Sequence, residues 1–144
     1  MLDGKIYALG GEAGDCLDTV DVYDPQADSW QRVASMPQRL CDHAAAVMRG
    51  KIYVTGGEID QGTSMNSAYV YDPQANAWAQ LASMGNARRL HTSAVVGGKL
   101  YVFGGHGGEE EYLSTVEVYD PASNSWALGT SMTFPRGCTA AAAL

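Results

Sequence analysis

The chain has 144 residues, of which 46% are hydrophobic, and its 16 acidic and 9 basic side chains give a formal net charge of -7. This length suits one globular domain with a core of its own. Because the balance is acidic and the basic residues are scattered, we expect no nucleic-acid partner. Because no apolar stretch reaches the ~18 residues that a membrane span needs, we also expect no membrane partner.

The cysteines and the start of the chain bear on the cellular compartment. The chain has three cysteines, an odd number, at Cys16, Cys41 and Cys138. They show no C-x-x-C spacing, and this pattern favours a reducing compartment. The N-terminal segment has no basic stretch followed by an apolar one, so we expect no secretory leader. The sequence therefore predicts a cytoplasmic protein.

A repeat of 48 residues organises the chain. Its markers recur three times at the same phase: Trp30, Trp78 and Trp126; Tyr23, Tyr71 and Tyr119; and the Asp-Pro pairs that begin at Asp24, Asp72 and Asp120. Three di-glycines follow at spacings of 46 and 48 residues, and they begin at Gly10, Gly56 and Gly104. The length varies between di-glycine and tyrosine, so we expect a loop there, and the fixed period indicates a repeat architecture.

Each repeat predicts short β-strands rather than helices, because apolar residues alternate with period 2 between turn-forming residues. In chain order the expected strands are Ile6 to Leu9, Val20 to Tyr23, Ser29 to Val33, His43 to Met48, Ile52 to Val54, Ala68 to Tyr71, the segment of Trp78, His91 to Val96, Leu100 to Phe103, Val116 to Tyr119, the segment of Trp126, and Thr139 to Leu144. The segments that begin at His43, His91 and Thr139 are rich in small residues. Alanine is a poor strand former, so its repeated use indicates a crowded place.

Four strands per repeat, one of them small and another carrying tryptophan, fit sheets arranged radially, with the small strand innermost. These residues resemble the kelch repeat family, whose hallmarks are a di-glycine that ends the second strand, a spaced tyrosine and a tryptophan on the fourth strand. The resemblance covers the whole chain. It implies an all-β, kelch-type β-propeller with three four-stranded blades.

The resemblance also implies that one blade is split between the two ends of the chain. We expect a single domain over 1-144, with complete blades at 36-83 and 84-131 and a split blade formed by 1-35 and 139-144. Closed propellers usually have 4 to 8 blades. We therefore expect a homodimer that closes a six-bladed ring, in which Thr139 to Leu144 of each chain pairs with the N-terminal strand of the other. The alternatives are a piece of a longer propeller and a larger assembly.

The loops carry the candidate binding residues, because rigid scaffolds place their binding residues there. In kelch substrate adaptors, arginines four residues after a methionine in the last loop of each repeat line a central pocket and bind acidic peptides. By that resemblance Arg88 and Arg136 are pocket residues. Arg89 joins them, and Arg39 substitutes for Leu40.

The position after each di-glycine faces the same pocket in those adaptors, and there it is typically aromatic. Here it is occupied by Glu12, Glu58 and His106, which we include among the ligand-binding candidates. These carboxylates could pair with the arginines and form a solvated salt-bridge network instead.

The other motifs predict no catalytic site, cofactor or metal. No nucleotide-binding glycine pattern is present, and His43 and His91 are repeat-equivalent, which favours a structural hydrogen bond over metal ligation. The predicted function is a non-catalytic scaffold that binds a protein or peptide, or assembles with itself. The alternatives are an engineered or excised half-propeller without a natural ligand, and a kelch-type enzyme such as a sugar-acid mutarotase or a copper oxidase.

Overall fold

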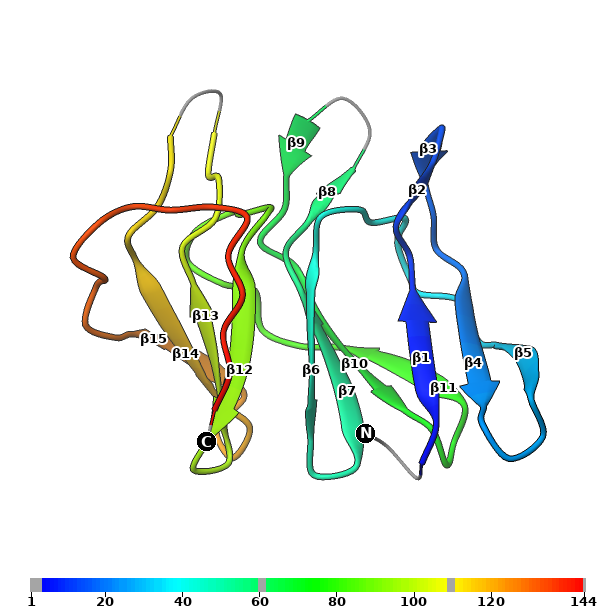
Figure 1. Ribbon diagram of the computed structural model, residues 1–144. Coiled ribbons are helices and arrows are strands. Elements are labelled where there is room, and N and C mark those ends of the chain that lie inside the picture. The colour runs from blue at the N-terminus through cyan, green and yellow to red at the C-terminus, as the bar shows by residue number, and fades with distance from the viewer. Residues whose placement is uncertain (1–3, 60–61, 109–110, 144) are drawn as a thin grey trace.

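Three antiparallel β-sheets stand side by side in the computed structural model, which describes residues 4–59, 62–108 and 111–143 (Figure 1). The first sheet has the order β1 (Ile6–Leu9), β4 (Val20–Asp24) and β5 (Ser29–Val33). The second has the order β6 (Ala44–Met48), β7 (Lys51–Thr55), β10 (Ala68–Asp72) and β11 (Ala77–Gln80). The third has the order β12 (Thr92–Val96), β13 (Lys99–Phe103), β14 (Val116–Asp120) and β15 (Ser125–Leu128). The all-β class is confirmed.

Two small hairpins extend the connections between the second and third strands of a repeat. They are β2 (Glu12–Ala13) with β3 (Asp15–Cys16), and β8 (Glu58–Ile59) with β9 (Thr63–Ser64). The sequence predicts a loop at these places. Both hairpins begin directly after a di-glycine, and they stand together at one end of the sheets (Figure 1).

The turn before each tryptophan strand is built from its own side chains. Asp72 Oδ1 accepts hydrogen bonds from the amides of Gln74 (3.0 Å) and Ala75 (3.3 Å), and Tyr71 donates to Asn76 Oδ1 (2.8 Å). Asn76 takes a positive φ of 47°, a conformation that asparagine tolerates better than most residues. The same turn recurs at Asn124 (φ 46°).

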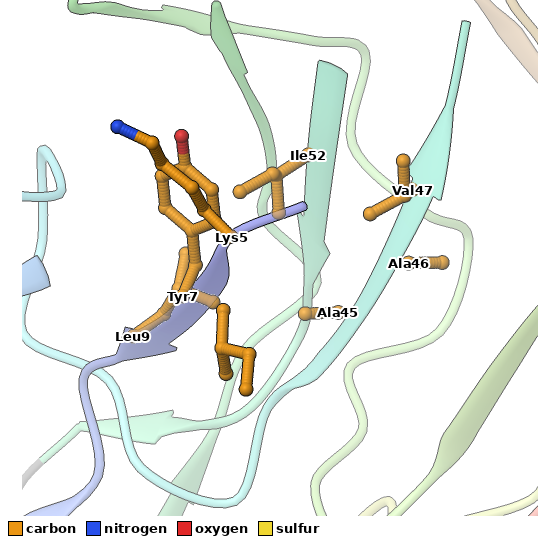
Figure 2. Close-up of a pocket in the computed structure, with 8 residues that line it drawn as sticks. Lys5, Tyr7, Leu9, Ala45, Ala46, Val47 and Ile52 are labelled. Atoms are coloured by element: carbon orange, nitrogen blue, oxygen red, sulfur yellow. The ribbon is translucent and has the colours of Figure 1, made fainter. Parts of the chain in front are cut away.

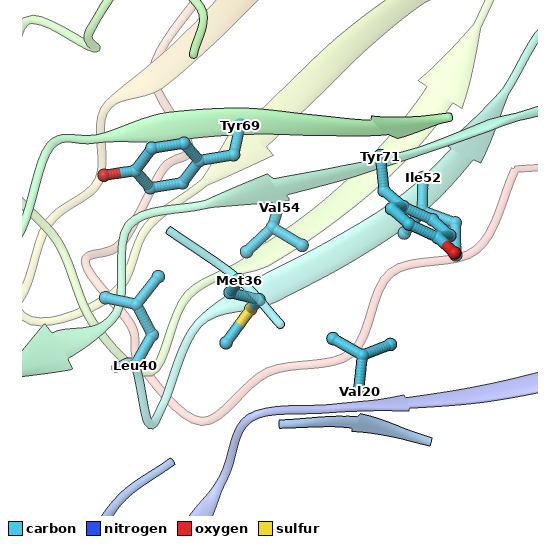
Figure 3. Close-up of a cluster of buried hydrophobic side chains, with 7 residues drawn as sticks. All are labelled: Val20, Met36, Leu40, Ile52, Val54, Tyr69 and Tyr71. Atoms are coloured by element: carbon cyan, nitrogen blue, oxygen red, sulfur yellow. The ribbon is translucent and has the colours of Figure 1, made fainter. Parts of the chain in front are cut away.

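The hydrophobic core lies between neighbouring sheets. One buried cluster joins the first and second sheets (Figure 3), and its members are Val20, Met36, Leu40, Ile52, Val54, Tyr69 and Tyr71. A second cluster joins the second and third sheets, and its members are Met48, Tyr53, Met84, Leu100, Val102 and Tyr119. Each sheet is therefore stabilised mainly by the sheet beside it.

In the second and third sheets, a tryptophan forms a hydrogen bond to the segment that follows the preceding sheet. Trp78 donates its indole N–H to the carbonyl of Ala34 (2.9 Å), and Trp126 donates to the carbonyl of Ala82 (2.8 Å). Trp30 holds the same position in the first sheet, before which the described residues form no other sheet, and it is 58% exposed. The outer face of the first sheet is thus uncovered.

The alanine-rich segment at 139-143 begins like an inner strand but pairs with no strand among the described residues. The amide of Cys138 donates a hydrogen bond to the carbonyl of Leu90 (2.7 Å), just as the amide of Leu90 donates to the carbonyl of Asp42 (2.9 Å). Cys138 and Leu90 both have a φ of 53°. Residues 139-143 nevertheless form no strand, and 140-143 are exposed. The expected inner strand is therefore not formed within the single chain, because the second strand of its own blade, β1, belongs to the opposite end of the molecule (Figure 1). Leu144, the last residue of that expected strand, lies outside the described residues.

The first glycine of each di-glycine has no room for a side chain. Gly56 has φ +54°, and a Cβ there would clash with the carbonyl oxygen of Arg88 and the ring of His91. Gly50 also has a positive φ (+72°), but a Cβ there would meet no atom within 4 Å. Comparing Gly50 with Gly56 therefore separates the cost of a positive φ from the cost of a steric clash.

We expect Gly56→Ala to destabilise the fold much more than Gly50→Ala. Gly50→Ala is the control, and its only cost is the strain of an alanine in the left-handed backbone conformation, about 1–2 kcal/mol. Gly56→Ala has the same strain and also forces the loop of Arg88 away from the sheet. Urea unfolding of both variants measures the difference, and equal losses would contradict the close approach.

Candidate functional site

The loop face is the end of the sheets at which the di-glycines lie, together with the loops that lead into the inner strands. Backbone hydrogen bonds join these two parts: Cys41 pairs with Glu58, and Arg89 pairs with His106. The structure thus brings the residue after a di-glycine next to the loop that enters the same sheet. Five of the predicted site residues are gathered here with part of their surface accessible: Glu12, Arg39, Glu58, Arg89 and His106.

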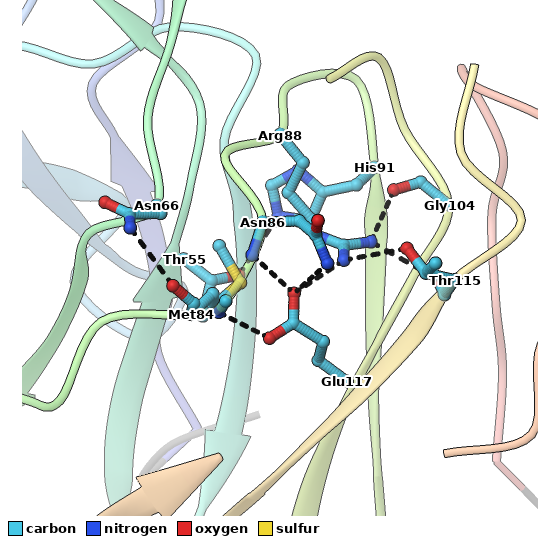
Figure 4. A network of polar contacts seen from close by, with 10 residues as sticks. Thr55, Asn66, Met84, Asn86, Arg88, His91, Gly104, Thr115 and Glu117 are labelled. Carbon is cyan, nitrogen blue, oxygen red and sulfur yellow. Dashed lines mark hydrogen bonds and ion pairs between the residues drawn. The ribbon is translucent and has the colours of Figure 1, made fainter. Parts of the chain in front are cut away.

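Arg88 does not line this face. Its side chain is 0% exposed, and its guanidinium donates to the carbonyl of Gly104 (2.7 Å), to Thr115 Oγ1 (3.2 Å) and to Glu117 Oε1 (2.7 Å) (Figure 4). The prediction that Arg88 binds a ligand is therefore wrong for this chain, because its side chain is fully buried and both terminal nitrogens of its guanidinium already donate to protein groups. Truncating one partner of such a buried pair leaves the other charge uncompensated.

Glu117 is the partner that the sequence analysis missed. Burial by itself would raise the pKa of its carboxyl, but the amides of Gly85 and Asn86 and the guanidinium of Arg88 outweigh that effect, and the pKa is lowered. Glu117 therefore stays ionised inside the protein. Its signal in the sequence is a carboxylate in the apolar strand Val116-Glu117-Val118, where the equivalent strand of the second repeat has Tyr69.

Arg89 and Glu58 form a half-buried ion pair on the loop face. The ring of His106 packs edge-on against Tyr112, with ring centroids 5.1 Å apart. Glu12 and Arg39 are exposed, and so is Arg136. The loop face therefore presents charges of both signs rather than the ring of arginines that the family resemblance implies.

Of the histidines at the heads of the inner strands, His91 is buried and His43 is partly buried. His91 shares a hydrogen bond with Thr55 Oγ1 (3.1 Å), and burial, with a smaller contribution from the charge of Arg88, lowers its pKa to about 3. Burial also lowers the pKa of His43. Both imidazoles are therefore neutral at pH 7, and the hydrogen bond of His91 agrees with the structural role expected for it.

Cys16 and Cys41 are joined by a disulfide and lie beside Glu58. These three residues form the one group of potential metal ligands found among the described residues. A disulfide offers no thiolate for a metal. Disulfides are rare in the reducing compartment that the sequence analysis favours, and the cytoplasmic location stays a prediction.

A cavity of about 360 Å³ lies between the first and second sheets (Figure 2). Its walls come from β1 and β6, with Ile52 of β7 and Lys5 beside β1, and its lining is mostly aliphatic and aromatic: Ile6, Tyr7, Leu9, Ala45, Ala46 and Val47. The sequence analysis did not predict a cavity at this place, and none of its predicted pocket residues lines it. It lies at the edge of β1, where the first sheet lacks the inner strand that the other two sheets possess.

The whole chain, residues 1–144, matches the family model described as the KLHDC2/KLHL20/DRC7 Kelch-repeats domain. The chain belongs to this kelch-repeat family. The solved structure of YjhT has the same fold, with a TM-score of 0.76 and 19% sequence identity over 93% of this chain and 50% of that chain. The sheets described above are thus blades of a kelch propeller, and this chain spans about half the length of YjhT.

Curated relatives share parts of the kelch region. Human Kelch-like protein 33 is 46% identical over 57 residues, mouse Kelch domain-containing protein 7A is 42% identical over 60, and the F-box/kelch-repeat protein At1g30090 of Arabidopsis thaliana is 39% identical over 59. These matches cover 39%, 40% and 40% of this chain and 11%, 7% and 15% of the relatives. The kelch blade is therefore shared, and the activities of the whole relatives are a separate question.

We expect the stability of this kelch domain to fall as the pH falls below about 6.5, partly because of His91. The unfolded histidine takes up a proton near its ordinary pKa of about 6.5, whereas the folded one resists protonation down to about 3. The unfolded state then binds more protons, and each pH unit in that interval lowers the free energy of unfolding by up to about 1.4 kcal/mol.

Urea unfolding at pH 7 and pH 5 of the unmodified chain and of His91→Gln measures this contribution. The variant should lose less stability between the two pH values. His106→Gln, the same change at a half-buried position on the loop face, is the control. An unchanged pH dependence in His91→Gln would contradict the assignment.

Proposed function

We propose that this kelch domain is a non-catalytic binding scaffold, and that two copies assemble into one closed ring of six blades. The observation that carries the proposal concerns the described part of the chain: the inner edge of β1 is uncovered and lies beside an apolar cavity, and the alanine-rich segment pairs with no strand. An open sheet edge next to an apolar surface favours association. In a two-fold ring, each chain would supply what the other lacks.

The registers of the complete blades specify how the segment would fit. Ala44 lies opposite Thr55 and Ala46 opposite Tyr53 in the second blade, and Thr92 lies opposite Phe103 in the third. Transferred by the repeat, this register sets Ala140 of one chain opposite Leu9 of the other, and Ala142 opposite Tyr7. The small side chains suit the narrow space between β1 and β6, since β12, an inner strand, already contacts β6 from the other side.

The uncovered surfaces on the outer blades support the same assembly. Ile6 and Trp30 of the first blade are 56% and 58% exposed. Leu128 of the third blade is 73% exposed, and Phe134, in the segment that follows it, is 67% exposed. The repeat equivalents of Ile6, which are Ile52 and Leu100, belong to the two buried clusters, and the equivalents of Trp30, which are Trp78 and Trp126, pack against them. The half-length match to YjhT is consistent with a chain that supplies half of a ring.

Binding of a protein or peptide is the second part of the proposal, and we assign it to the loop face. Glu12, Arg39, Glu58, Arg89 and His106 combine accessible charge with an imidazole, on loops held by a rigid scaffold. With Arg88 removed from the set and Glu58 paired to Arg89, the face suits a polar ligand of mixed charge better than a purely acidic peptide.

We expect native mass spectrometry to give the mass of two chains, and Ala142→Glu to give folded monomers. A glutamate at this position would place a charge in the crowded inner layer opposite Tyr7. Ala122→Glu, on an exposed turn, is the matched control and should remain a dimer. A folded unmodified monomer, a larger assembly, or a dimer that survives Ala142→Glu would overturn this mode of closure.

We expect peptides selected by display against the unmodified chain to bind the loop face. The double variant Glu58→Gln/Arg89→Gln should lose these peptides, because it removes both charges of the half-buried pair. The control is Lys99→Gln/Asp120→Asn, which removes an ion pair (3.0 Å) at the opposite end of the strands. Equal binding by both double variants, at equal mass and thermal stability, would rule out the loop face.

A further inference from the structure

We propose that Arg136 of one chain binds the carboxylate of Asp21 in the other chain, and so repeats across the dimer interface the buried Arg88–Glu117 pair. This inference rests on the proposed ring. It assigns Arg136 to subunit pairing rather than to ligand binding. The argument compares three repeat-equivalent places, two inside the chain and one between chains.

The first place is the site around Arg88. The loop that carries Arg88 enters the third blade, and its side chain points to the end of the second strand (Gly104) and the start of the third (Thr115), with Glu117 two residues further on (Figure 4). Every residue of this site lies on the same blade that the loop enters. An arginine in this loop therefore needs that blade for its hydrogen bonds.

The first blade carries the same site without an arginine from its own chain. Gly10, Thr19 and Asp21 hold the places of Gly104, Thr115 and Glu117, and the Gly10 amide donates to the Thr19 carbonyl (2.9 Å) as the Gly104 amide donates to that of Thr115 (3.1 Å). The strand registers agree, because Asp21 lies opposite Ala8, and Glu117 lies opposite Val102.

The second blade is the internal contrast. The loop that enters it carries Leu40 in place of an arginine, and the position of the carboxylate holds Tyr69, which donates to Gln38 (3.1 Å). Leu40 and Tyr69 instead belong to the apolar cluster between the first two blades. Arginine and carboxylate thus occur together or are absent together. The loop of Arg136 is the one that would enter the first blade of a second copy.

The backbone already holds Arg136 as it holds Arg88. The Arg136 carbonyl accepts from Gly105 (2.9 Å), and its amide donates to Leu113 (3.1 Å). The corresponding bonds of Arg88 are to Gly57 (2.8 Å) and Met65 (2.9 Å). The two residues differ in exposure: Arg88 is buried by the blade it enters, whereas Arg136 is exposed, and the described residues form no blade after it.

Asp21 is accessible from the side that a second copy would cover. In the single chain its carboxylate pairs with exposed Arg32 across the sheet (2.9 and 3.1 Å). A carboxylate accepts more than two hydrogen bonds, so Arg136 can join without displacing Arg32. Because aspartate is one methylene shorter than glutamate, we expect contact with the guanidinium alone, without the two loop amides that Glu117 also accepts from.

The test is a charge exchange between two chains. Arg136→Asp alone should raise the dimer dissociation constant at least tenfold, because two carboxylates then face each other at both interfaces, and Asp21→Arg alone should do the same with two arginines. A mixture of the two variants restores an Arg–Asp pair at both interfaces. It should therefore form a heterodimer as tight as the unmodified dimer.

Arg39→Asp is the matched control, since it reverses an exposed arginine in the equivalent loop of the first repeat, and it should leave the dissociation constant unchanged. Sedimentation measures the constants, and circular dichroism checks that each chain is folded. Arg136 and Asp21 are both surface residues of the single chain, so folding should survive the changes.

The outcomes separate this inference from the ring itself. A folded unmodified monomer overturns the ring and the pair together. A dimer unaffected by either single variant leaves the ring standing and overturns the pair. Weakening by both single variants without restoration in the mixture also overturns the pair, because the two residues then act separately.

Discussion

A four-stranded blade cannot bury its two faces by itself, and this constraint governs the rest of the molecule. Both buried clusters lie between sheets, and the indole hydrogen bonds of Trp78 and Trp126 also reach to the preceding sheet. Stability in such a repeat protein comes from nearest-neighbour interfaces. Three blades in a row make two interfaces and leave two outer faces, one with Trp30 and the other with Phe134, unmatched.

The charged groups are divided between these interfaces and the solvent. Arg88 and Glu117 bind each other inside the protein and connect one blade to the loop before it. Their hydrogen bonds leave few donors and acceptors for a ligand. Glu58 and Arg89, on the loop face, are half-buried and therefore partly accessible to solvent. A one-residue step along the chain, from Arg88 to Arg89, thus separates an internal contact from a surface that another molecule can reach.

The sequence predicts the repeated features well and the unrepeated ones badly, for a physical reason. Strands, di-glycine turns and tryptophan positions answer packing demands that recur in every blade, so three copies report the same rule. The burial of Arg88 depends on Glu117, 29 residues away, and the second blade replaces both residues with an apolar pair. The hairpins β2–β3 and β8–β9 lie where the repeat length varies, and there the pattern gives no register.

The difference between the apolar interface of the first two blades and the charged interfaces gives the proposed ring a way to select which blades meet. If the third blade of one chain met a blade of the second type, Arg136 would face Tyr69 and Leu40 would be replaced by an unpaired guanidinium in an apolar cluster. A buried charge without a partner is costly, whereas Asp21 in the first blade provides one. Discrimination of this kind depends on the penalty of the wrong pairing as much as on the strength of the right one. The Arg136–Asp21 pair would then contribute more to the specificity of the dimer interface than to its affinity.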